Sequence, residues 1–154
     1  MPTTQLLPEL KVPAPEEGIL LTQFVIASDV ARSREFYADV LGGEVVLEEN
    51  SERLTPAIVK LANAWIIINV GGGPTEDKPE VTLEAPVDLN RSSAFLNIRV
   101  ADINAVYEEW SGKGAEFLTP PIDNHGIELR CYIRDPDGHL IEVGQLTSIP
   151  ESSG

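Results

Sequence analysis

Apolar residues recur at helical spacing in two stretches of the chain, and an aspartate precedes each stretch. Such spacing gives a helix one buried stripe, and a carboxylate just before a helix accepts hydrogen bonds from its free backbone N–H groups. Glycines that can end a helix follow both stretches, at Gly42-Gly43 and at Gly112 and Gly114. The pattern predicts two helices, which begin after Asp29 and Asp102 and bury the following residues: Val30, Phe36, Tyr37, Val40 and Leu41 in the first, and Ile103, Val106, Tyr107 and Trp110 in the second.

Short apolar and β-branched runs predict one strand before each helix and three after it. In the first half the predicted strands are 19–27, 44–48, 54–61 and 65–71. In the second half they are 94–100, 115–118, 127–134 and 139–145.

The two halves also share landmarks at one offset. Asp29 and Asp102 are 73 positions apart, and so are Asn69 and Glu142, which lie in the matching segments INVG and IEVG. A half of this size leaves one apolar face of its sheet exposed, and pairing two halves, within a chain or between chains, buries that face. The sequence therefore predicts an α+β protein of two tandem β-α-β-β-β modules.

Turn-rich and charged residues divide the chain further. We expect an extended N-terminal arm at 1–18, a first module at 19–71, a linker at 72–91, a second module at 92–146 and a disordered tail at 147–154.

Composition narrows the function classes. The net charge is −14, from 25 acidic and 11 basic residues, which argues against binding to nucleic acid or anionic membranes. The chain starts without a signal-peptide pattern and has no apolar run of membrane-spanning length. Its single cysteine, Cys131, excludes an internal disulfide and CxxC metal motifs. We expect a cytoplasmic protein.

Two motifs resemble a known family. They are SREFYADVLGG at the end of the first helix (33–43) and DPDGHLIEV before and along the last strand (135–143). Together with the duplicated modules, they are similar to the vicinal oxygen chelate superfamily, which includes glyoxalase I, extradiol dioxygenases, and fosfomycin- and bleomycin-resistance proteins. The resemblance covers about residues 19–146. It implies curled mixed sheets around a cleft with a divalent metal near its centre, on a scaffold that hosts several chemistries.

The resemblance places the metal-ligand positions at Thr22, Asn69, Phe95 and Glu142. Only Glu142 is a good ligand, because Phe95 has no lone pair, Thr22 is a weak neutral donor, and an asparagine suits calcium-like ions. We therefore expect no metal or other cofactor. If a divalent metal does bind, the interpretation assigns it to Glu142, with His125 or Gln23 as partner.

Alternation along the strands, combined with the family's inward positions, predicts what lines the cleft. Glu142 would be a buried carboxylate, with Arg130 as the obvious partner. Two readings stay open, a ligand site or an internal Glu–Arg pair that fills a vestigial metal site. If a reaction occurs, Glu142 is the candidate base and Tyr132 the candidate donor. The predicted substrate-binding residues are Thr22, Phe24, Ile67, Asn69, Phe95, Asn97, Arg130 and Tyr132.

The sequence thus predicts a glyoxalase/bleomycin-resistance/dioxygenase-like protein that binds a small molecule in a largely apolar cleft without a metal. The alternative is a divalent-metal-dependent lyase, isomerase or dioxygenase that uses Glu142 with non-standard ligands. We expect a homodimer.

Overall fold

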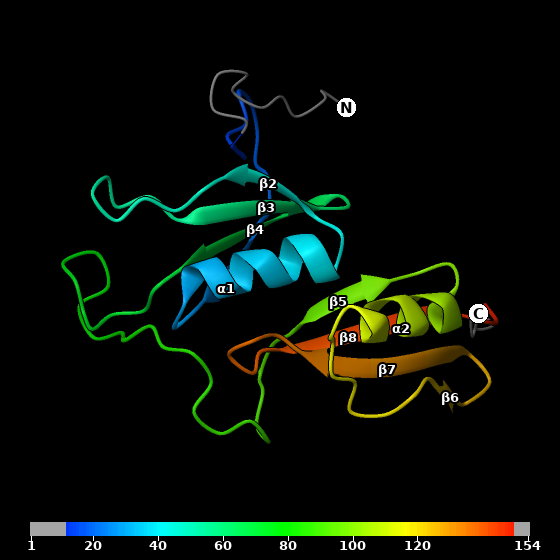
Figure 1. Cartoon of the computed structure of the whole chain (residues 1–154). Helices are drawn as coiled ribbons and strands as arrows, with labels where there is room; N and C mark the ends of the chain where they lie inside the picture. Colours follow the sequence, from blue (N-terminus) through cyan, green and yellow to red (C-terminus); the bar gives the residue numbers. More distant parts are fainter. Residues whose placement is uncertain (1–11, 150–154) are drawn as a thin grey trace, which may run out of the picture. The chain divides into compact units, whose positions relative to one another are not determined.

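The structure, a computed structural model, describes residues 12–149. It divides into two compact units, with the boundary between Val87 and Asp88 (Figure 1). This boundary falls inside the segment 72–91 that was predicted to be a linker. Most of the predicted arm and tail, residues 1–11 and 150–154, lies outside the described residues.

The first unit has the predicted order of strand, helix and three strands. β1 (Gln23–Ile26) is parallel to β4 (Ala64–Asn69), and β4, β3 (Ala57–Leu61) and β2 (Glu44–Leu47) are antiparallel neighbours. The helix begins as α1 (Val30–Glu35) and continues as the π-helical turn η1 (Phe36–Val40).

The predicted helix ends are confirmed in both units. The Asp29 carboxylate accepts the backbone N–H of Arg32 at 3.2 Å, and that of Asp102 accepts the N–H of Ala105 at 3.1 Å. Gly42 and Gly114 follow the helices with positive φ of 85° and 102°, a conformation that glycine adopts without steric cost.

The second unit repeats the topology of the first. β5 (Leu96–Arg99) is parallel to β8 (Leu140–Leu146), and β8 pairs antiparallel with β7 (Glu128–Arg134), which pairs with β6 (Ile122–Asn124). Between β5 and β6 lies α2 (Ile103–Gly112). The predicted α+β fold of two β-α-β-β-β modules with curled mixed sheets is confirmed.

One predicted strand was wrong. Residues 115–118 form no strand, and only Phe117 makes an isolated bridge, to Ile133. The edge strand is β6, which resumes pairing at Ile122, opposite Arg130. Pro120 and Pro121 lie between these points, and a proline has no N–H to donate to a ladder. The prolines therefore divide the edge into a bridge and a short strand.

Alternation gives the second sheet two different faces. Cys131, Ile133, Ile141 and Val143 are at most 1% exposed, on the face where α2 packs against β8. Burial raises the pKa of the Cys131 thiol to about 11, so it stays protonated as part of this core. The residues between them point to the opposite face, which carries the polar side chains described below.

The DPDG turn before β8 ties the linker to the second unit. Asp135 is 4% exposed, and its carboxylate accepts the N–H groups of Asp137 and His139 at 3.0 and 2.8 Å. Gly138 has φ 95°, and a Cβ there would lie 2.2 Å from the side chain of Leu89. The end of the linker therefore packs directly on the turn.

None of the helices in residues 12–149 is long and apolar enough to cross a membrane.

Candidate functional site

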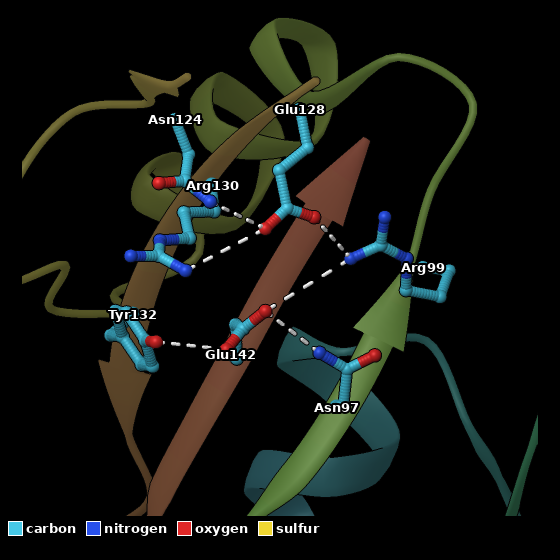
Figure 2. A network of polar contacts seen from close by, with 7 residues as sticks. All are labelled: Asn97, Arg99, Asn124, Glu128, Arg130, Tyr132 and Glu142. Carbon is cyan, nitrogen blue, oxygen red and sulfur yellow. Dashed lines mark hydrogen bonds and ion pairs between the residues drawn. The ribbon is translucent and has the colours of Figure 1, made fainter. Parts of the chain in front are cut away.

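Three adjacent strands of the second unit bring three predicted site residues together. In the register of the sheet, Glu142 on β8 lies between Asn97 on β5 and Tyr132 on β7. Because side chains at paired positions point to the same face, all three project from the face opposite α2. Figure 2 shows them side by side, with Glu142 in the middle.

Both carboxylate oxygens of Glu142 accept hydrogen bonds. Asn97 Nδ2 donates to Oε1 at 2.9 Å, and the Tyr132 hydroxyl donates to Oε2 at 2.8 Å. Glu142 is only 8% exposed, and a buried carboxylate needs such donors to offset its lost hydration.

The Tyr132 hydroxyl remains a donor at neutral pH. Its burial raises its pKa, and the hydrogen bond to Glu142 and the negative charge of that carboxylate raise it further. The phenolic oxygen also has lone pairs, so while its proton is directed to Glu142 it can still accept a hydrogen bond from a ligand.

Arg99 is the cation that lies near Glu142, with Nη1 at 4.0 Å from Oε1. The same Nη1 donates to Glu128 Oε2 at 2.9 Å. A Cβ at Gly144 would lie only 2.2 Å from that nitrogen. Figure 2 shows Arg99 reaching toward both carboxylates, and the absence of a side chain at Gly144 leaves the space that its guanidinium occupies.

Arg130 pairs with Glu128, at 3.6 Å, rather than with Glu142 as expected. The sheet register explains this, because Arg130 lies opposite Gly144, whereas Tyr132 lies opposite Glu142. Glu128 also accepts from Asn124 Nδ2 at 3.2 Å. The pKa of Glu128 is lowered, mainly by the hydrogen bond from Arg99. Burial acts in the opposite direction, and Asn124 and Arg130 lower the pKa by smaller amounts.

A cavity of about 380 Å³ lies beside this network. Tyr132 belongs to both, and its ring makes an edge contact with Phe95, with centroids 6.1 Å apart and planes at 72°. The volume is in the range of small-molecule sites. One wall, called the linker wall below, comes from residues 89–92, which are the end of the linker and the residue that follows it. The other walls come from Phe95, Leu118, Tyr132, Arg134 and Leu140.

The candidates of the first module lie within the first unit. Phe24 on β1 is 49% exposed and is paired in register with Ile67 on β4, and Thr22 is an exposed residue just before β1. Asn69 accepts the N–H of Val70 through Oδ1 at 2.9 Å and lines a separate cavity of about 260 Å³ in its own unit.

The two proposed metal partners have different settings. Gln23 alternates with Phe24 and so shares the face of the buried Val25, not that of Asn69. His125 is an exposed residue with φ 55° in the turn between β6 and β7. Within residues 12–149, no group of three or more His, Cys, Asp or Glu side chains could together hold a metal ion.

Several residues of the hydrogen-bond network and of the cavity were not among the predicted site residues. Alternation does place Arg99 on the face of Asn97, but its position beside Glu142 depends on the register of the strands. Arg134 shares the parity of Tyr132 in the same way. The position of the linker wall could not be predicted from the sequence, because turn-rich segments have no hydrophobic periodicity that assigns their side chains to a face. The omitted residues are Arg99, Asn124, Glu128 and Arg134, together with 89–92.

A family model described as Glyoxalase/Bleomycin resistance protein/Dioxygenase superfamily matches residues 19–143. The virulence protein STM3117 of Salmonella typhimurium is 30% identical over 122 residues, which cover 77% of each chain. A probable lactoylglutathione lyase of Synechocystis is 27% identical over 136 residues, which cover 84% of this chain and 96% of the relative.

Solved structures share the fold. A glyoxalase/bleomycin resistance protein/dioxygenase from Nocardioides has a TM-score of 0.68 at 17% identity, covering 92% of this chain and 91% of that one. TnmS3, an antibiotic binding protein from a Streptomyces species, has a TM-score of 0.58 at 18% identity, covering 85% of this chain and 99% of that one.

Proposed function

The chain belongs to the Glyoxalase/Bleomycin resistance protein/Dioxygenase superfamily, and from this membership we propose that it is a small-molecule-binding protein that works without a metal. The proposed site is the cavity beside Tyr132, Phe95 and Glu142 in the second unit. TnmS3, described as an antibiotic binding protein, shares the fold, and this likeness supports a binding role for the scaffold.

The surroundings of Glu142 carry the proposal. A divalent ion at this carboxylate would compete with the hydrogen bonds from Asn97 and Tyr132. It would also lie close to the positive charge of Arg99. A cation site normally gathers several oxygen, nitrogen or sulfur ligands, whereas the groups around Glu142 are hydrogen-bond donors. This donor set does not fit a metal.

The same contacts favour binding over proton transfer. A general base must lie within hydrogen-bond reach of the substrate, whereas Glu142 does not line the cavity and each of its oxygens already accepts a hydrogen bond from a neighbour. Glu142 instead fixes the hydroxyl of Tyr132, and Tyr132 lines the cavity. We therefore assign Glu142 a positioning role and Tyr132 a ligand-contacting role.

The alternative function is that of a metal-dependent lyase, isomerase or dioxygenase. The relative described as a probable lactoylglutathione lyase supports this alternative. Protein purified without chelator should contain well under one divalent ion per chain by elemental analysis. Its melting temperature should stay the same after treatment with EDTA and after addition of Mn²⁺, Ni²⁺ or Zn²⁺. One tightly held ion per chain, together with a lower melting temperature in EDTA, would favour the alternative.

Binding can be tested with three naphthalene probes of one shape and different charge: 2-naphthoate, 2-naphthalenemethanol and 2-naphthylmethylammonium. We expect at least one to raise the melting temperature, because a ligand that binds only the folded state adds about 2.7 kcal/mol of stability at one hundred times its Kd. Phe95→Ala should weaken that binding about 5- to 10-fold, because part of an aromatic wall is lost.

Leu146→Ala is the matched control for Phe95→Ala. Leu146 is 51% exposed, Phe95 is 45% exposed, and both belong to the second unit, but only Phe95 lines the cavity. If none of the probes binds, or if both variants weaken binding equally, the cavity is not the site. Three expectations from the sequence stay predictions: the homodimer, the cleft between modules and the cytoplasmic location.

A further inference from the structure

The charge of the cavity is opposite in sign to that of the whole chain. The lining residues include two arginines, Arg91 and Arg134, and no carboxylate, although the net charge is −14. Charges farther away than about 8 Å are largely screened at physiological ionic strength. Two carboxylates lie just behind the lining, Asp88 beside Arg91 and Glu142 beside Tyr132, so the charge that a ligand meets depends on how each arginine is matched.

The two arginines differ in how their charge is matched. Arg91 is largely exposed, and its Nε lies 3.4 Å from the carboxylate of Asp88. Arg134 Nη1 donates to the backbone carbonyl of Leu89 at 2.5 Å, which is an uncharged partner. Within residues 12–149, no carboxylate lies at ion-pair distance from Arg134. Arg134 is thus the arginine whose charge is available to a ligand.

The guanidinium of Arg134 is held in place by the linker. Its acceptor, Leu89, packs on Gly138 of the DPDG turn. The next residues are ordered by a turn in which the Asp88 carboxylate accepts the N–H of Asn90 at 2.9 Å. A guanidinium has five N–H donors in a planar fork, so most of them remain after the bond to Leu89. A fork held in this way is suited to a carboxylate.

The rest of the cavity suits a flat apolar body. Phe95 and Tyr132 stand at 72° to each other and form two sides of a corner. Leu140 lies opposite Arg134 in the β7–β8 register, on the same face of the sheet, and Leu118 adds a further apolar side chain. An aromatic ring in this corner would gain burial on both sides, with Arg134 at its edge.

We propose that the cavity binds a small aromatic carboxylate, whose acid group pairs with Arg134 and whose ring lies against Phe95. This inference rests on the proposed function and names the class of its ligand.

The test compares 2-naphthoate with the neutral 2-naphthalenemethanol on the wild type and three variants. The wild type should bind the anion at least about 10-fold more tightly than the neutral probe, because a hydrogen bond to a charged group is worth about 1.5–3 kcal/mol. Arg134→Gln should abolish this preference and leave the affinity for the neutral probe nearly unchanged. Arg134→Lys should keep part of it, and Lys113→Gln, at a basic residue of the second unit that does not line the cavity, nearly all of it. Isothermal titration calorimetry measures all four proteins.

The pattern of affinities separates the possible outcomes. If Arg134→Gln weakens both probes equally, Arg134 only shapes the wall by holding Leu89, and the inference is overturned. If the wild type prefers the neutral or the cationic naphthalene, the inference fails while the proposed function stands. If the wild type binds none of the probes, the proposed function fails, and this inference fails with it.

Discussion

Replacing Ile133 by alanine is expected to lower the free energy of unfolding by about 2–5 kcal/mol, the cost of removing a buried Ile side chain and leaving a cavity. Ile133 is fully buried on β7, opposite Ile141, and its backbone also pairs with Phe117. Both cross-strand neighbours are held by backbone pairing, so the space cannot close easily. Urea unfolding followed by circular dichroism measures the loss, which should appear as a lower midpoint with an unchanged slope.

Ile122→Ala is the matched control. Ile122 lies on the edge strand β6 of the same sheet and is 54% exposed. Its replacement should change the free energy of unfolding by less than about 1 kcal/mol, because little apolar surface is removed from the interior. Equal losses in the two variants would show that the face toward α2 is not the core of the second unit.

Much of the fold could be predicted because the physical signals are local or periodic. The capping aspartates, the glycines after the helices and the alternating strands each depend on a few neighbouring residues. The fixed offset between the halves then assigns one topology to both. The same alternation, combined with the inward positions that the family resemblance implies, predicted that Asn97, Tyr132 and Glu142 point to one face of the sheet, where the structure brings them together.

The arginine that lies near Glu142 could not be predicted from the sequence. Alternation along a strand shows which face a side chain points to, but not which residues of neighbouring strands lie opposite each other. Arg99 and Arg130 both have the parity of the site face, and the sequence alone ranks neither above the other. The register places Arg130 next to Glu128, and Gly144 leaves room for Arg99. Such a choice depends on cross-strand neighbours that are distant in the chain.

The linker wall of the cavity was also beyond prediction. Residues 89–92 have no hydrophobic period, and their position depends on Leu89 packing on Gly138 and accepting from Arg134. These contacts join the linker to the DPDG turn and the end of β7. A turn-rich segment indicates where the chain bends, but not which surface it covers.

Changing Asn97 to aspartate is expected to destabilise the second unit strongly at neutral pH. The substitution is nearly isosteric, and it replaces the donor of a 2.9 Å hydrogen bond to Glu142 by a second carboxylate. Two unit charges 4 Å apart repel by about 4 kcal/mol at an effective dielectric constant of 20. Because the repulsion raises the folded-state pKa of one carboxyl, the loss should be present at neutral pH and shrink as the pH falls toward the unfolded-state pKa.

Adding Glu142→Gln to Asn97→Asp should restore most of the stability. The glutamine amide can then donate to the new aspartate while its oxygen accepts from Tyr132, so the pair keeps one negative charge near Arg99. Urea unfolding of the wild type, both single variants and the double variant in EDTA gives the coupling energy. A double variant as unstable as Asn97→Asp alone would contradict this arrangement of Asn97, Glu142 and Tyr132, and so would an Asn97→Asp variant as stable as the wild type.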